Sequence, residues 1–321
     1  MNKIKLMVLL FVATGLTAGL SAQTLDEVTA KYNEAGAALQ AREFEKAAGL
    51  FEQVIQQGAL VGADAQATVN NAQTHLMQSL IQTGWAYASQ QNFPKAIEFL
   101  QKAAERSELY GNAQLMRTAT QRLGQVYFAS GADAYNNERY EEAIKIFSEG
   151  FAADDTNTDM GLNLARSYDK MDSLEKAIET YGNIIALESR HSRYAEPAKV
   201  AKEELVEAVL ERASKAAAAG DLDGAINFTT MALEVDPTNA AAQLMRLQMT
   251  NNKKDYKAII EYGEAAAEAQ TDDALKSDAY FMLGAAYQNQ GNTPKAIEAF
   301  RKVTAGSNAA QARSLISELN K

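Results

Sequence analysis

The chain repeats one short pattern seven times along its 321 residues. The pattern begins with a polar turn, which is followed by an aromatic or aliphatic residue, a short polar stretch and an alanine. The alanine is usually followed by isoleucine, and an aromatic residue usually lies four positions after the alanine. Self-similarity at a period of about 20–50 residues is typical of repeat proteins, whose units pack on their neighbours. The repeated alanines are Ala47, Ala96, Ala143, Ala177, Ala225, Ala258 and Ala296, at spacings of 49, 47, 34, 48, 33 and 38.

Each unit is predicted to hold two antiparallel helices joined by a short turn. In the last unit, apolar residues between Tyr280 and Tyr287 recur at three and four positions, as on one face of a helix. Gly291-Asn292 ends that helix, and Pro294 falls in the first turn of the next, where its missing N–H costs nothing. The chain has 60 alanines and four prolines, which favours helix. The predicted fold class is therefore all-α.

This pattern resembles the tetratricopeptide repeat (TPR). The last unit carries the resemblance on Tyr280, Leu283, Gly284, Tyr287, Gly291, Ala296 and Phe300. The resemblance implies an α-solenoid of about seven antiparallel helix pairs over residues 24–307, and we expect 307–321 to form a C-terminal capping helix. It also implies small residues where paired helices cross (Gly84, Gly131, Ala165 and Gly284). Larger residues are expected to fill the gap to the next unit (Phe51, Leu100, Phe147, Tyr181, Tyr262 and Phe300), with Thr229 replacing an aromatic residue in the fifth unit.

Three spacings exceed the family length of 34 residues by 13 to 15 residues. About four extra helical turns would account for this, shared as about two per helix, and 64–90 and 113–137 read as long helices. Alternatively, 106–112 and 187–197 are loops. The polar stretch 188–199 is the predicted seam between an N-terminal lobe of about four repeats (23–187) and a C-terminal lobe of about three repeats plus the capping helix (200–321).

Residues 1–22 are predicted to be a cleavable signal peptide. Lys3 and Lys5 precede an uncharged apolar run from Leu6 to Leu20, and Ala22 ends a stretch of small residues. Removing this segment takes away two lysines and no acid, which changes the formal net charge from -10 to -12. We expect an exported bacterial protein of the periplasm, with full secretion as the alternative and no membrane insertion after cleavage.

The composition argues against several kinds of chemistry. The chain has no cysteine, so disulfides, thiolate metal sites and catalytic thiols are excluded. With two histidines, a histidine-based metal site is not expected, and both His75 and His191 are predicted to be solvated. The acidic charge argues against nucleic acid as a partner. No nucleophile elbow, zinc-protease motif or phosphate loop is found. We therefore expect no enzymatic activity and no cofactor.

The resemblance implies a groove, lined by the first helix of each pair, that binds a partner peptide or helix. Projecting the repeat register places nine residues on it: Tyr32, Ile81, Trp85, Phe128, Tyr135, Leu162, Arg166, Phe281 and Gln288. This lining is mostly apolar, which favours a hydrophobic guest over a carboxylate clamp. Trp85 either faces this groove or packs against a lengthened neighbouring helix. The predicted function is a protein-binding scaffold of the cell envelope; the alternatives are self-association, or a module that binds a small ligand or glycan.

Overall fold

The computed structural model describes residues 24–321, so the predicted signal peptide lies outside the described residues. Within this range the chain forms fifteen α-helices and two short 3₁₀ segments, with no strand. The helices are α1 (Leu25–Gln40), α2 (Phe44–Val61), α3 (Gln66–Ser89), α4 (Phe93–Leu109), α5 (Ala113–Asn136), α6 (Tyr140–Ala153), α7 (Thr158–Lys170), α8 (Leu174–Leu187), α9 (Ala195–Ala218), α10 (Leu222–Val235), α11 (Ala240–Asn252), α12 (Tyr256–Glu268), α13 (Asp273–Asn289), α14 (Thr293–Arg301) and α15 (Ala309–Leu319). The 3₁₀ segments are η1 (Ala63–Ala65) and η2 (Ser192–Tyr194).

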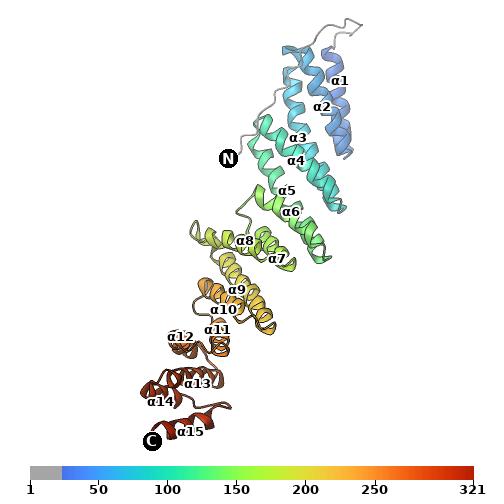
Figure 1. Cartoon of the computed structure of the whole chain (residues 1–321). Coiled ribbons are helices and arrows are strands. Elements are labelled where there is room, and N and C mark those ends of the chain that lie inside the picture. The colour runs from blue at the N-terminus through green and yellow to red at the C-terminus, as the bar shows by residue number, and fades with distance from the viewer. Residues whose placement is uncertain (1–23) are drawn as a thin grey trace, which may run out of the picture. The chain divides into compact units, whose positions relative to one another are not determined.

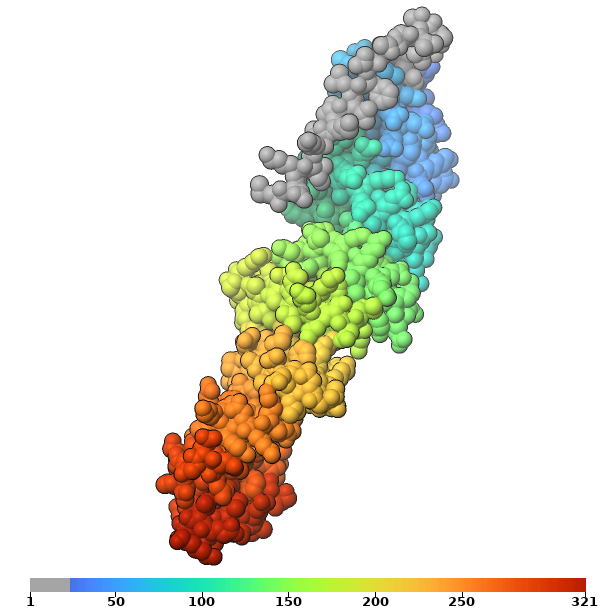
Figure 2. All heavy atoms as spheres, viewed as in Figure 1, coloured from blue at the N-terminus to red at the C-terminus, as the bar shows by residue number. Residues whose placement is uncertain are grey.

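The helices form seven pairs, α1/α2 to α13/α14, and α15 packs on α14 after the last pair (Figure 1). This confirms the predicted all-α repeat fold and its capping helix. Helices mainly contact their neighbours in sequence, so within each unit successive segments of chain follow one another, as Figure 2 shows. None of the described helices is both long and apolar enough to cross a membrane.

The chain divides into two compact units, and the division falls inside α5, between Tyr127 and Phe128. The stretch 188–199, predicted as a seam, lies within the second unit. There α8 ends at Leu187, η2 follows, and α9 begins at Ala195 and packs directly against α8. The three long spacings come from long first helices, because α3, α5 and α9 each have 24 residues whereas α7 and α11 have 13.

These lengths correct the predicted distribution of the extra residues. Eleven more residues amount to about three helical turns, and they lie in the first helix of the pair rather than being shared equally between two helices. The alternative loop at 106–112 is not formed, because α4 runs on to Leu109 and α5 begins at Ala113. The alternative loop at 187–197 is a short connection that contains η2.

Each of the seven turns within a pair contains one residue with a left-handed backbone, directly before the N-cap of the second helix. These residues are Arg42, Gln91, Glu138, Asp172, Gly220, Lys254 and Gly291, with φ between 54° and 81°. Only two of them are the glycines that this conformation favours. At four of the turns an Asn or Asp side chain then caps the second helix, as when Asn92 accepts from the N–H of Lys95.

The repeated alanine is the fourth residue of the second helix in six pairs, and each of these six is completely buried. In the sixth pair the fourth residue is Ile259, which is also completely buried, and Ala258 precedes it and is half-buried. The predicted marker Ala258 is therefore wrong by one position. The shortened turn before α12 misplaced it, because the true N-cap is Asp255.

In the second, third and seventh pairs, the eighth residue of the second helix packs on a glycine of its own pair, sixteen positions earlier in the chain. A Cβ added at Gly131 would lie 2.5 Å from Phe147 Cε1, and one at Gly284 would lie 2.6 Å from Phe300 Cδ1. The small residue therefore allows the large one to fill the crossing within a pair, whereas the sequence suggested the gap to the next pair. Thr229, predicted to replace an aromatic residue at this position, is completely buried.

The sixth pair reverses this arrangement. At the same two positions it has Leu247 on the first helix and Gly263 on the second, and a Cβ at Gly263 would lie 3.5 Å from Leu247 Cδ1. The large and small residues have exchanged helices, which keeps the crossing filled. Tyr262, predicted to fill the gap, is half-buried and its hydroxyl bonds to Thr250.

Candidate partner-binding surfaces

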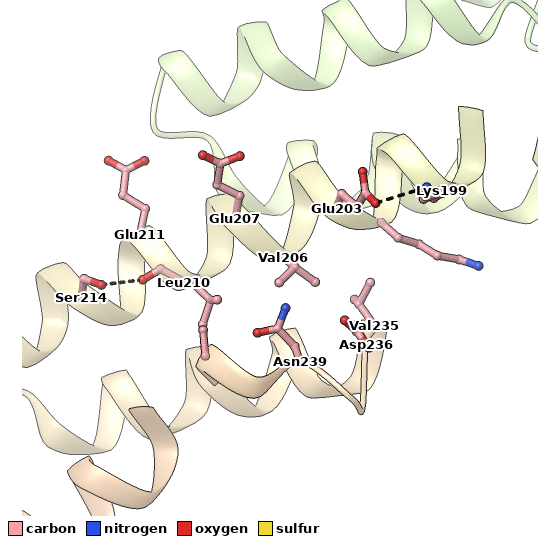
Figure 3. A pocket seen from close by; sticks show the side chains of 12 residues that line it. Lys199, Glu203, Val206, Glu207, Leu210, Glu211, Ser214, Val235, Asp236 and Asn239 are labelled. Atoms are coloured by element: carbon pink, nitrogen blue, oxygen red, sulfur yellow. Dashed lines mark hydrogen bonds and ion pairs between the residues drawn. The ribbon is translucent and has the colours of Figure 1, made fainter. Parts of the chain in front are cut away.

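A groove lies along α9 in the second unit, where this helix faces the connection between α10 and α11 (Figure 3). Because α10 is antiparallel to α9 and has 14 residues against 24, the N-terminal part of α9 extends beyond it. The groove has a volume of about 690 Å³. Its lining runs along α9 from Lys199 to Ser214 and ends on Val235, Asp236, Asn239 and Ala241.

Two rows of α9 side chains line this groove, each with a spacing of four residues. Val206 and Leu210 form the apolar row and point toward Val235 and Asn239 of the opposite edge (Figure 3). The neighbouring row is Glu203, Glu207 and Glu211, because residues four apart in a helix lie above one another on one face. The groove therefore has an apolar strip beside a strip of carboxylates.

The ends of the carboxylate row are neutralised and its centre is not. Lys199 Nζ lies 3.9 Å from a Glu203 oxygen, and Lys215 Nζ lies 2.8 Å from a Glu211 oxygen. The hydrogen bond from Lys215 lowers the pKa of the Glu211 carboxyl. Glu207, between them, has no hydrogen bond or ion pair with any described residue.

Arg166, predicted to line the groove of the first helices, is held by a carboxylate of the chain itself. Its Nε donates to Glu204 Oε2 at 2.9 Å, and its Nη2 donates to the other Glu204 oxygen. Tyr181 also donates to Glu204, at 3.1 Å. The bond to Glu204 raises the pKa of the Arg166 guanidinium. Arg166 is thus already paired and does not offer a free cation to a guest carboxylate.

In the first unit, the predicted residues differ in accessibility. Tyr32 is half-buried and packs near Phe51 at a ring distance of 5.7 Å, beside a cavity of about 390 Å³. Ile81 is only 4% exposed and belongs to the core, so its predicted place on a surface is wrong. Trp85 is 39% exposed, and the Arg122 guanidinium of α5 lies 4.1 Å from the centre of its ring. Trp85 therefore has one ring face against the next first helix and is still accessible.

In the second unit, Leu162 is 7% exposed and is a core residue, which corrects its predicted place. Phe128 is 37% exposed and Gln288 is exposed. Tyr135 is half-buried edge-on against Tyr140 at 5.4 Å. Phe281 is half-buried, 5.6 Å from Phe300. Each of these aromatic residues thus has a ring neighbour in its own pair; Phe128 and Tyr135 lie on α5, and Phe281 lies on α13.

Both histidines were predicted to be solvated, and the structure agrees only for His191. His75 is half-buried and stacks on Phe51 at 5.3 Å, so the expectation of a solvated side chain is wrong for it. His191 is exposed and accepts a hydrogen bond from the N–H of Arg193, at the start of η2. Among residues 24–321, no group of three or more His, Asp or Glu side chains is placed to hold a metal ion.

Sequence reasoning missed the α9 groove. A signal for it was present, since Val206 and Leu210 beside Glu203, Glu207 and Glu211 form adjacent rows of one helix. To recognise these rows as an accessible surface, one must know that α9 is longer than α10. The repeat spacing alone did not show which helix contains the extra residues.

Residues 278–305, which span most of α13 and α14, match the tetratricopeptide-repeat family. The last helix pair is a tetratricopeptide repeat. The same crossing of a small and a large residue recurs in earlier pairs of the chain. No curated protein sequence matches the chain significantly.

Solved TPR structures show similar helical repeats at low sequence identity. Yeast Sti1, solved as a TPR2AB-domain:pHSP90 complex, is 14% identical, with 92% of this chain and 99% of that chain covered and a TM-score of 0.33. A tetratricopeptide-repeat protein from Parabacteroides merdae is 15% identical, with coverages of 76% and 99% and a TM-score of 0.29. The TPR domain of P58(IPK) is 11% identical, with coverages of 92% and 97% and a TM-score of 0.31. These values are too low to transfer a partner or function.

Proposed function

We propose that this protein is a non-enzymatic scaffold of the cell envelope that holds a segment of a partner protein on its first helices. The observation that carries the proposal is Trp85, a tryptophan on the first helix of its pair that remains 39% exposed. Tryptophan is enriched among the residues that dominate protein interfaces, because its large ring contributes much contact area. Arg122 fixes one side of the ring, so little side-chain freedom would be lost on binding.

Replacing Trp85 by alanine is expected to weaken partner capture at least tenfold, with little loss of helicity. Tenfold corresponds to about 1.4 kcal/mol, well within the range for a central interface tryptophan. The measurement is the amount of each protein crosslinked in cells to the wild-type chain and to the variant, with helicity followed by circular dichroism. Leu60→Ala is the matched control, since this leucine is 79% exposed at the end of α2, a second helix.

Unchanged capture by Trp85→Ala, together with a loss of stability, would mean that the ring serves packing against α5 and not a partner. A stable homo-oligomer that crosslinks to nothing else would contradict the scaffold and favour self-association. Light scattering of the purified chain distinguishes this outcome.

The envelope location rests on the first 22 residues, with Lys3 and Lys5 before the apolar run. We expect the protein in the periplasmic fraction to lack these residues and to begin at Gln23, because export exposes the segment to signal peptidase. Intact-mass measurement after cell fractionation tests this. A chain that keeps Met1 and stays in the cytoplasm would contradict the location and leave the binding proposal to its own test.

A further inference from the structure

The carboxylate row of α9 is unfavourable for the isolated chain. Glu207 has like charges four residues away on both sides, at Glu203 and Glu211, and such pairs destabilise a helix. Lys199 and Lys215 offset the outer two charges but do not reach Glu207. A cation placed at the centre of the row would therefore be attracted by a carboxylate that has no other described partner.

The strip beside this row is apolar and is also incompletely covered. Leu210 and Val235 are half-buried, while Val206 forms the floor at 5% exposure. The cavity volume of about 690 Å³ is in the range that holds several side chains of a guest. A guest that filled the strip would bury apolar surface, which favours binding because that surface is removed from water.

We propose that the α9 groove binds a cationic amphipathic segment of a partner protein. Apolar side chains of that segment lie on Val206, Leu210 and Val235, and a Lys or Arg of the same segment reaches Glu207. The groove lining has four carboxylates (Glu203, Glu207, Glu211 and Asp236) against two ammonium groups (Lys199 and Lys202), which favours a basic guest over an acidic one. This inference rests on the proposed scaffold function but uses a different surface from Trp85.

Lys199 and Lys215 offset Glu203 and Glu211, and Lys202 pairs with Glu188 outside the groove, so the carboxylates left without a lysine are Glu207 and Asp236. Lys202 Nζ lies 2.8 Å from a carboxylate oxygen of Glu188, and Lys199 faces Glu203. Asp236, at the opposite edge, accepts hydrogen bonds from the Thr238 N–H and hydroxyl at 3.0 and 2.7 Å, which fixes the connection that forms this edge. The edge is thus built before a guest arrives, and ordering it costs little on binding.

The test uses three fluorescent helical peptides of about 14 residues and the full mature chain. The first has leucines on one face and lysines beside them, the second has glutamates in place of the lysines, and the third has serines in place of the leucines. Fluorescence anisotropy at low salt is expected to show micromolar binding of the first peptide and at least tenfold weaker binding of the other two. The affinity of the first peptide is expected to fall with added salt, since the contact to Glu207 is exposed.

Glu207→Lys is expected to weaken binding of the first peptide at least tenfold. The variant should be as stable as the wild type or more stable, because the introduced ammonium group would lie between the carboxylates of Glu203 and Glu211, so misfolding would not explain the loss. Glu298→Lys on α14 is the control for net charge, because Glu298 is exposed and lies outside the groove. Its effect is expected to stay below about twofold, since a single distant charge is screened.

Equal losses in Glu207→Lys and Glu298→Lys would overturn the proposal, since attraction would then come from the net acidic charge. Equal binding of the serine peptide would also overturn it, because the apolar strip would play no part. Trp85→Ala is expected to leave peptide binding unchanged. The capture experiment with Trp85→Ala therefore tests the scaffold function, and the peptide-binding experiment with Glu207→Lys tests the α9 groove.

Discussion

Replacing Phe147 by alanine is expected to lower the free energy of unfolding by about 3–5 kcal/mol. Its ring is completely buried in the third helix pair and packs on the backbone of α5 at Gly131. The crossing of α5 and α6 depends on this contact, because glycine provides no side chain that could move into the space. The cavity therefore stays largely open, which puts the cost at the upper part of the range for large-to-small changes.

Urea unfolding followed by circular dichroism measures this loss. Phe128→Ala is the matched control, since the same residue type in the same pair is 37% exposed and should cost no more than about 1 kcal/mol. Repeat proteins are stabilised by contacts between neighbouring elements, so a weakened central pair is also expected to broaden the transition or split it in two. Equal losses for the two variants would show that the crossing repacks and that Gly131 is not needed for it.

The same crossing explains which parts of the fold could be predicted. Six buried alanines at one helical position and the glycines sixteen residues before the large residues are local signals, so seven pairs could be counted from the sequence. The sixth pair could not be aligned, because Leu247 and Gly263 exchange the large and small roles and keep the volume constant. Packing conserves the total side-chain volume at the crossing, and different residue types can supply that volume.

The turns show a second limit. Five of the seven left-handed residues are Arg, Gln, Glu, Asp or Lys, so no glycine marks the turn. The tertiary contacts of the pair hold these backbones in a conformation that costs an ordinary residue about 1–2 kcal/mol. A sequence reading that relies on glycine finds the turns at Gly220 and Gly291 and must infer the others from the repeat.

The candidate sites were harder to predict than the fold, because they depend on distant partners and on helix length. The register placed Ile81 and Leu162 on a surface, yet the neighbouring helices bury them. Arg166 is neutralised by Glu204, which lies 38 residues away on another helix. The α9 groove exists because a long first helix is paired with a second helix of ordinary length. None of these contacts is encoded in the spacing of one repeat.

Replacing Asp169 by alanine is expected to lower the free energy of unfolding by about 3 kcal/mol, because it leaves a buried guanidinium with too little compensation. The Arg212 side chain is 9% exposed, and its Nη1 forms an ion pair with Asp169 Oδ1 at 2.7 Å, which joins α9 to α7. Its Nη2 lies 3.0 Å from Asp172 Oδ1, on the turn after α7. The two carboxylates differ in environment, since the Asp169 side chain is 22% exposed and that of Asp172 is 84% exposed.

Asp172→Asn is the matched variant for the other end of the same guanidinium. It should cost no more than about 1 kcal/mol, because water already screens an exposed pair. Asparagine is chosen because Asp172 has φ 54°, a backbone that asparagine tolerates and alanine does not. Urea unfolding at low and high salt distinguishes the two contacts of Arg212. Added salt should weaken only the exposed contact, the one to Asp172. Similar costs at both positions would mean that solvent reaches Arg212 freely, and that its pair with Asp169 adds little to the Arg166–Glu204 ion pair and the apolar contacts between α7 and α9.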